Sequence, residues 1–225
     1  MFSNGDSLNK PGVLLLHGWM STQDRMYEIA EMLSTEMGAA CLTVDLRGHG
    51  KTGGDLELFS RKDFLDDVLA AYDFLTLQEN VDKTRMGVVG SSFGGYLAAL
   101  LTARRSLSWA VLRVPADYPD EGFMESKALA PDDMGWRYQE RAWNTTDALR
   151  SVHSFGGKLL IVESEKDEVI PRQTLLNYQD ATQGSATYIT MKNAPHSITR
   201  HPDFKREFNQ TVLQWLRSEV YPEKS

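Results

Sequence analysis

Short apolar runs of β type alternate with longer stretches of helical periodicity along most of this chain. Residues 12–18, GVLLLHG, form a nearly continuous apolar run, which is typical of a strand buried on both faces. Residues 22–37 instead place Met26, Ile29 and Leu33 at helical spacing. Because alternating strands and helices form βαβ units with right-handed crossovers, we expect a mainly parallel sheet with helices on both faces. The pattern thus predicts an α/β fold.

The alternation predicts about six strands and one interruption. Strands are expected at 12–18, 39–46, 85–90, 109–116, 158–164 and 186–191, and helices at 22–37, 64–75, 93–105, 172–179 and 204–216. Between the fourth and fifth strands, residues 117–150 carry prolines, glycines and large aromatics without a clear period. Since 225 residues fit one domain, we expect a single domain over 1–225 with a short cap insert at about 117–150.

The composition argues against several classes of partner. The net charge of −7 disfavours nucleic acid and anionic membranes, since both need a basic face. No apolar run approaches the roughly 18 residues that span a bilayer. The start, MFSNGDSLNKPG, has no basic segment followed by an apolar core, so no signal peptide is expected. The single cysteine, Cys41, allows no intrachain disulfide. A cytoplasmic protein with a small-molecule partner fits these features.

Residues 87–97, GVVGSSFGGYL, join an expected strand to an expected helix through four glycines. Within them, GSSFG (90–94) fits the G-x-S-x-G pattern, in which a sharp, strained turn lifts the central serine out of the sheet. Ser91 lacks this frame, because valine and phenylalanine stand two positions either side of it. The pattern predicts Ser92 as a nucleophile at the amino end of a helix. The alternative is a glycine-rich turn whose serine only caps the helix.

A serine hydroxyl needs a base to remove its proton and an acid to orient that base. Of the five histidines, His196 lies in NAPHS just past the last expected strand, where the loop can fold back over the elbow; the other four are expected to be structural or at the surface. Among the acids of ESEKDEVIP, Asp167 is preferred because Pro171 opens the next helix and rigidifies the loop. Glu163 is the reserve. The order Ser92, Asp167, His196 is that expected at a nucleophile elbow.

The motif HGW follows the first expected strand, and Gly18 lets the backbone approach the elbow closely. Backbone N–H groups aimed at an oxyanion stabilise the transition state of acyl transfer. We predict the amides of Trp19 and Phe93 as these donors. The alternative is a simple strand-ending turn with Trp19 packed in the core. The glycine-rich loop DLRGHGKTGG after the second strand is expected to be structural.

In their order along the chain, HGW, DLRGHG, GSSFGG, SEKDEVIP and NAPHS resemble the landmarks of α/β-hydrolase-fold serine hydrolases over nearly the whole sequence. The compact size and the elbow are similar to small carboxylesterases and to the serine-aminopeptidase-like and dienelactone-hydrolase-like branches. The last of these commonly has cysteine at the elbow, where this chain has serine. The aspartate nucleophile of epoxide hydrolases and haloalkane dehalogenases is missing. About ten residues precede the first strand, which leaves no room for the two leading strands of the full family sheet.

The resemblance implies the α/β-hydrolase fold, acyl transfer through a serine ester, and neither a metal nor an organic cofactor. We expect a serine carboxylesterase that hydrolyses small to medium carboxylic esters. A peptidase, amidase or thioesterase with the same residues is the alternative among enzymes, and a non-catalytic small-molecule receptor on the same fold is the alternative outside them.

The aromatic residues of the insert are candidates for an apolar substrate pocket. The substrate-binding residues predicted there are Tyr118, Trp136, Tyr138 and Trp143. The alternative, which fits at least half of the insert's aromatics, is that they form a small core of the insert itself. The acids in its DYPDE and PDD segments make an anionic substrate less attractive.

Overall fold

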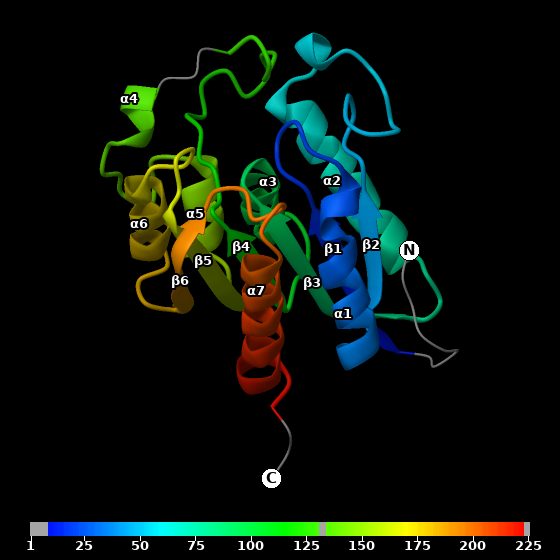
Figure 1. The fold of residues 1–225 in the computed structure, drawn as a ribbon. Helices are drawn as coiled ribbons and strands as arrows, with labels where there is room; N and C mark the ends of the chain where they lie inside the picture. Colours follow the sequence, from blue (N-terminus) through cyan, green and yellow to red (C-terminus); the bar gives the residue numbers. More distant parts are fainter. Residues whose placement is uncertain (1–8, 131–133, 223–225) are drawn as a thin grey trace.

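Six parallel strands form the sheet in the described part of the chain. The computed structural model describes residues 9–130 and 134–222. The strands are β1 (Lys10–Leu16), β2 (Ala40–Val44), β3 (Val81–Ser91), β4 (Trp109–Arg113), β5 (Lys158–Lys166) and β6 (Ala186–Pro195). They lie in the order β2-β1-β3-β4-β5-β6, and every neighbouring pair is parallel. Figure 1 shows this sheet between two layers of helices, so the α/β fold expected from the sequence is confirmed.

Helices cover both faces of the sheet. They are α1 (Tyr27–Met37), α2 (Arg61–Thr76), α3 (Phe93–Thr102), α4 (Met134–Arg137), α5 (Asp147–His153), α6 (Arg172–Ala181) and α7 (Pro202–Trp215), with short turns η1 (Gln23–Met26), η2 (Leu56–Leu58) and η3 (Leu216–Val220). A capping box between Ser60 and Asp63 starts α2 three residues before the predicted position. Within the described residues, no helix combines the length and the apolar character needed to cross a membrane.

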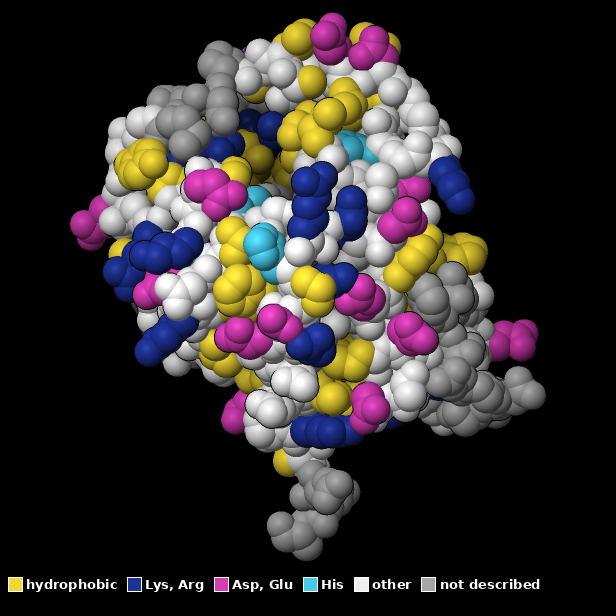
Figure 2. All heavy atoms as spheres, in the orientation of Figure 1, with side chains coloured by type: hydrophobic (Ala, Val, Ile, Leu, Met, Phe, Trp, Pro, Cys, Tyr) yellow, Lys and Arg dark blue, Asp and Glu magenta, His cyan; other side chains and the backbone are white. Residues whose placement is uncertain are grey.

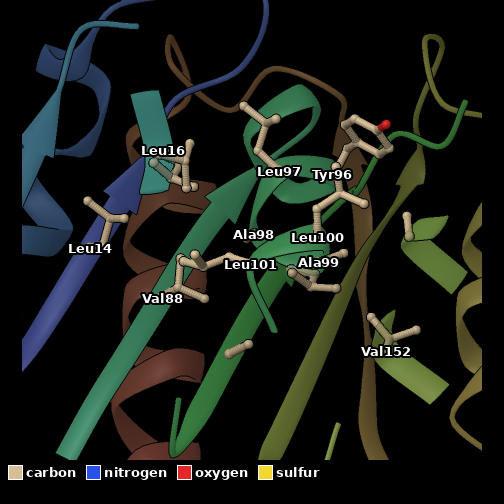
Figure 3. Close-up of a cluster of buried hydrophobic side chains, with 14 of the residues drawn as sticks. Leu14, Leu16, Val88, Tyr96, Leu97, Ala98, Ala99, Leu100, Leu101 and Val152 are labelled. Atoms are coloured by element: carbon tan, nitrogen blue, oxygen red, sulfur yellow. The ribbon is translucent and has the colours of Figure 1, made fainter. Parts of the chain in front are cut away.

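Alternate residues of the strands enter two separate cores. Leu14 and Leu16 of β1 and Val88 of β3 belong to the core beneath α2, α3, α5 and α6, and Figure 3 shows these three side chains beside α3. Val13 and Leu15 pack on the opposite face, against α1 and α7. Because successive strand side chains point to opposite faces, a strand covered on both sides must be apolar throughout. The continuous run in β1 is therefore a direct consequence of its position.

The connection between β4 and α5, residues 114–146, lies over the carboxyl end of the sheet, where α4 is seen in Figure 1. It is tied to the start of α2. The Lys127 N–H donates to the Phe59 carbonyl oxygen at 2.8 Å, and Arg61 Nη2 donates to the Glu121 carbonyl oxygen at 2.6 Å. The connection thus reaches from β4 back across the sheet to the segment between β2 and α2.

The insert predicted at 117–150 covers most of this connection. Its residues 131–133 lie outside the described residues. Its last residues, 147–150, begin α5, whose buried side chains belong to the core beneath α3. The part of the chain that stands clear of the sheet layers therefore ends at the start of α5.

Candidate active site

Ser92 lies in the sharp turn between β3 and α3. Its backbone has φ 56° and ψ −117°, a region that is strained for a residue with a side chain. Close packing demands the flanking glycines: a Cβ on Gly90 would lie 2.2 Å from the Gly94 carbonyl oxygen, and one on Gly94 would lie 2.4 Å from the Leu16 carbonyl oxygen. The Ser92 N–H donates to the Arg113 carbonyl oxygen at 2.9 Å. The turn is therefore locked from both sides.

Ser92, His196 and Asp167 form one chain of hydrogen bonds. His196 Nε2 lies 3.1 Å from Ser92 Oγ, and His196 Nδ1 lies 2.8 Å from Asp167 Oδ2 and 3.0 Å from Oδ1. The three residues follow β3, β6 and β5, so each stands at the carboxyl end of a parallel strand. The imidazole side chain is 15% exposed and the carboxylate side chain 6%. The carboxylate is thus shielded from water, while the imidazole keeps an open edge.

The Asp167 carboxylate is oriented by its own loop. Its Oδ1 accepts the Val169 N–H at 2.8 Å and the Ile170 N–H at 2.7 Å. Such backbone donors fix the orientation of the carboxylate. Glu163, the reserve candidate from the sequence, instead accepts a hydrogen bond from Arg172 Nε at 3.1 Å. The geometry places Asp167, rather than Glu163, against the imidazole.

The segment after β1 passes directly beside Ser92. A Cβ added to Gly18 would lie 3.3 Å from Ser92 Cβ and 3.9 Å from Ser92 Oγ. Met20 has φ 53°, and its N–H donates to His49 Nε2 at 3.1 Å. Since Nε2 accepts, the His49 proton is on Nδ1, which donates to the Arg47 carbonyl oxygen 2.9 Å away. The buried His49 imidazole therefore holds the turn that contains the Trp19 amide.

His17 and Arg47 brace the loops on either side of this turn. His17 Nε2 accepts the Leu46 N–H at 3.2 Å, and its Nδ1 lies 2.7 Å from the Gly18 carbonyl oxygen. Burial lowers the pKa of His17, which favours the neutral ring that these two bonds require. Arg47 Nη2 pairs with Asp67 of α2 at 2.6 Å. These contacts tie the loops after β1 and β2 together and give both residues structural roles.

A cavity of about 680 Å³ opens beside Ser92 and His196. We call it the elbow cavity. Its walls include the turn after β1, η1 and α1, the ends of β3 and β4, the segment between β6 and α7, and α7 itself. The apolar lining includes Met26, Ile29, Val89, Ile198 and Phe208, and the charged lining is Arg25, Glu28, Arg113, Glu168, Arg200 and Lys205. Figure 2 shows Lys and Arg side chains gathered beside histidines on this face, above α7 and α1. The cavity is thus mixed in character and basic on part of its wall.

A second cavity, of about 250 Å³, lies under the β4–α5 connection and is hereafter the connection cavity. Tyr118 and Trp136 both line it, as does Lys127. Lys127 Nζ is 4.5 Å from the centre of the Trp19 ring, and Trp19 lines the elbow cavity. The Trp19 ring also packs edge-on against Phe93. The contact between Lys127 and Trp19 therefore joins the linings of the two cavities.

The structure places two of the aromatic residues predicted to bind substrate away from both cavities. Tyr138 is 64% exposed and Trp143 is 42% exposed, and neither lines the two cavities. Trp143 stacks on His153 of α5, with ring centres 4.0 Å apart. The physical reason is that, in a segment without helical or strand periodicity, the sequence does not indicate the direction in which an aromatic side chain points.

Two basic residues near the site were missed by the sequence interpretation. Arg113 ends β4 and lines the elbow cavity, and Lys127 contacts the Trp19 ring. The sequence did contain a sign of Arg113. An arginine inside the apolar run WAVLRVPA is unusual, because buried charges are rare unless they are paired. No comparable feature marked Lys127, which lies in the aperiodic connection.

Within residues 9–130 and 134–222, no group of three or more His, Cys, Asp or Glu side chains is arranged to hold a metal ion. The polar groups around Ser92 are instead arranged as a hydrogen-bonded serine, imidazole and carboxylate. This arrangement can raise the nucleophilicity of a hydroxyl by removing its proton.

A model of the prolyl oligopeptidase family matches residues 25–221, a range that includes Ser92, Asp167 and His196. The chain belongs to the prolyl oligopeptidase family. The same match includes the connection between β4 and α5, so the family resemblance is not confined to the elbow.

Relatives of this prolyl oligopeptidase family member are distant in sequence. Protein bem46 of Schizosaccharomyces pombe is 24% identical over 169 residues, which cover 72% of this chain and 53% of that protein. The chain therefore spans about half the length of that curated relative.

Solved structures share the fold. Est1E from Butyrivibrio proteoclasticus, determined with ferulic acid bound, superposes with a TM-score of 0.72 at 18% identity and covers 95% of this chain and 91% of its own. A structure from a study of the metagenome-derived lipolytic enzymes LipS and LipT has a TM-score of 0.71 at 22% identity, with 95% of this chain and 96% of that chain covered. At these identities the likeness establishes the α/β-hydrolase fold and no more.

Proposed function

We propose that this protein is a hydrolase, and specifically a serine carboxylesterase that cleaves small to medium carboxylic esters through an acyl-serine intermediate. The observation that carries the proposal is the contact of Ser92 Oγ with His196 Nε2 at 3.1 Å, on an imidazole whose other nitrogen lies 2.8 Å from Asp167. The elbow cavity beside this contact has the size of a small-molecule site. The esterases and lipases among the structural neighbours support an ester substrate.

The first half of the reaction forms the acyl-enzyme. His196 Nε2 takes the proton of Ser92 as Ser92 Oγ attacks the ester carbonyl, and Asp167 stabilises the resulting imidazolium. The carbonyl electron pair moves onto oxygen, giving an oxyanion that the amides of Trp19 and Phe93 stabilise. Phe93 is the first residue of α3, so its N–H belongs to the unpaired first turn and to the positive end of the helix dipole. The bond to the leaving oxygen then breaks, and His196 protonates the alcohol.

The second half repeats these steps with water. His196 takes a proton from water as its oxygen attacks the acyl carbon, and the same amides stabilise the second oxyanion. Collapse of this intermediate breaks the bond to Ser92 Oγ, and His196 returns the proton to the serine. The carboxylic acid leaves as its anion. We assign the β4–α5 connection the role of a cap over this chemistry, with Tyr118 and Trp136 as its substrate-facing aromatics.

Peptide or amide hydrolysis by the same residues is the second candidate, because the matching family model is that of prolyl oligopeptidases. The two reactions differ in their leaving groups. An amine leaves only if it is protonated in the transition state, whereas an alkoxide or phenolate leaves more readily. The site must therefore position His196 more strictly for amides than for esters.

A substrate panel separates these functions. We expect turnover of p-nitrophenyl esters of graded acyl length, and no measurable release from peptide p-nitroanilides of matched size. Higher kcat/KM for the anilides would favour the peptidase, and turnover confined to acyl thioesters would favour a thioesterase. A fluorophosphonate probe should modify the protein once, at Ser92, as read by peptide mass spectrometry. A protein that is neither labelled nor active on any of these substrates would fit a receptor instead.

His49 offers a test of the oxyanion loop. We expect His49→Ala to lower kcat about 10- to 100-fold with a smaller change in KM, because the Met20 N–H loses its acceptor and the Trp19 amide is no longer held in place. The matched control is His153→Ala, which removes a partly buried imidazole that bonds a backbone carbonyl and lines neither cavity. Equal kcat values for the two variants would contradict a positioning role for His49.

A further inference from the structure

The elbow cavity gathers positive charge in a chain whose net charge is −7. Its lining includes three arginines and one lysine against two glutamates. One of these charges is matched locally, since Lys205 pairs with Glu28. Arg25 and Arg200 are exposed at the rim, and neither forms an ion pair with any described residue. The wall beside Ser92 therefore has an excess of positive charge.

Arg113 adds a buried charge to the floor of this cavity. It is 4% exposed and lines the cavity at the end of β4. Its Nη2 donates to the His196 carbonyl oxygen at 2.8 Å and to Ser164 Oγ at 3.0 Å. Its Nε has no hydrogen-bond partner among the described residues, and its guanidinium pairs with none of their carboxylates.

The Arg113 charge persists at neutral pH. Burial lowers the pKa of its guanidinium to about 10, while Asp167 opposes that shift, so the group remains protonated near pH 7. A buried charge that lacks an ion pair is costly, because water no longer solvates it. A negatively charged group in the cavity would offset that cost.

Two acids of the DYPDE segment, Asp117 and Glu121, line the other cavity. The connection cavity has three basic and three acidic lining residues, Arg61, Lys127, Arg137, Asp117, Glu121 and Glu125. Asp120, from the same acidic segment, pairs with Arg150 at 2.6 Å. None of these carboxylates lines the elbow cavity. The charges of these described acids are thus matched locally, and they leave the excess of positive charge in the lining of the elbow cavity uncompensated.

We propose that the ester substrate carries a second, ionised carboxylate, held in the elbow cavity by Arg25 and Arg200 at the rim with Arg113 supplying a fixed positive field beneath. The inference rests on the proposed esterase function and names its substrate class. Two kinds of ester share this chemistry: a monoester of a dicarboxylic acid, with the charge on the acyl side, and an ester whose alcohol bears the carboxylate. Arginine suits the role because its planar guanidinium binds a carboxylate through two parallel hydrogen bonds.

The test compares charged and neutral esters of matched length. Monomethyl adipate is paired with methyl hexanoate for the acyl side, and the acetyl ester of 4-hydroxybutyrate with butyl acetate for the alcohol side, with acid release followed by pH-stat titration. We expect kcat/KM for at least one charged ester to exceed that of its neutral partner by about tenfold, the effect of one well-placed charge contact. Raising salt to about 0.5 M should reduce this ratio, because exposed charges are screened.

Variants assign the preference to the two rim arginines. Arg25→Gln and Arg200→Gln should each lower the ratio of charged to neutral kcat/KM about fivefold, as expected for an exposed ion pair. The matched control is Arg217→Gln, which makes the same change in net charge at an exposed residue paired with Glu36, outside the elbow cavity. A wild-type ratio of one or less for both ester pairs, or an equal loss in the control, would overturn the proposal.

A binding measurement separates this inference from the proposed function. If neither the charged nor the neutral esters are hydrolysed, the esterase proposal fails, yet the anion site can still be read by calorimetry with adipate alone. We expect the Kd for adipate to rise about fivefold in Arg25→Gln and Arg200→Gln and to stay the same in Arg217→Gln. Absence of adipate binding, or equal Kd values in all four proteins, would reject the anion site whatever the outcome with esters.

Discussion

Ser92→Ala is expected to lower kcat for ester hydrolysis by about 10⁴- to 10⁶-fold, because the covalent route through an acyl-serine is removed and only binding and oxyanion stabilisation remain. The fold should be unaffected. The strained turn is set by Gly90 and Gly94, which the variant keeps, and alanine fits wherever a serine side chain fits. We expect the free energy of unfolding to change by less than about 1 kcal/mol, since a single hydrogen bond is lost.

The neighbouring hydroxyl provides the control. Ser91 precedes the nucleophile by one residue, and its Oγ accepts from Arg113 Nη1 at 3.3 Å. Ser91→Ala should therefore lose far less activity than Ser92→Ala, and it should still be labelled once by a fluorophosphonate. Initial rates and a urea unfolding curve for both variants check this. Retention of most esterase activity in Ser92→Ala, with the fold intact, would remove the basis of the proposed mechanism.

The strands could be predicted because each is covered on both faces. An apolar run such as that of β1 leaves few other options, and the predicted positions of all six strands overlap the observed ones. The strand boundaries were not predicted where backbone hydrogen bonding extends beyond the apolar residues. β3 begins at Val81, which pairs with Lys10, although the polar residues that follow Val81 give no strand pattern. Contacts between distant segments set that boundary.

The residues of the site were partly predictable for the same kind of reason. Ser92 is framed by glycines, and Asp167 and His196 follow strands, so their chemistry and their order along the chain were both visible in the sequence. Which aromatics of the insert turn inward was not visible. Tyr118 packs against Tyr96, whereas Tyr138 is exposed, and neither direction follows from local spacing.

The basic wall of the elbow cavity shows most clearly what could not be predicted from the sequence. Arg25, Arg113 and Arg200 come from η1, from the end of β4 and from the segment before α7. Arg25 and Arg200 are unremarkable in their own stretches of sequence, Arg113 stands out only as a charge within an apolar strand, and the net charge of the whole chain has the opposite sign. Only the fold brings the three together beside Ser92. Net charge therefore describes association of the whole protein with other macromolecules, while the sign of a substrate is set by a few local side chains.

The Asp167→Asn variant is expected to reduce kcat by about 10³- to 10⁴-fold with little change in KM. Asp167 Oδ1 accepts the N–H groups of Val169 and Ile170. In the variant the amide oxygen must keep these two donors, so the new NH₂ group points at His196 Nδ1. That nitrogen must then accept, which moves the imidazole proton to Nε2. A protonated Nε2 cannot take the proton of Ser92, and the base is lost although every heavy atom stays in place.

The comparison with Glu163→Gln makes this prediction specific. Glu163 is also a buried carboxylate beyond the elbow, yet it accepts from Arg172 Nε and Thr190 Oγ1, so its replacement should lower kcat less than about tenfold. Because Asn keeps the shape and the backbone hydrogen bonds of Asp167, thermal unfolding of that variant should stay close to that of the wild type. Steady-state kinetics on one ester therefore decide between the two acids: a loss in Glu163→Gln as large as in Asp167→Asn would mean that the carboxylate beside the imidazole acts through the loop structure and not through the proton on His196.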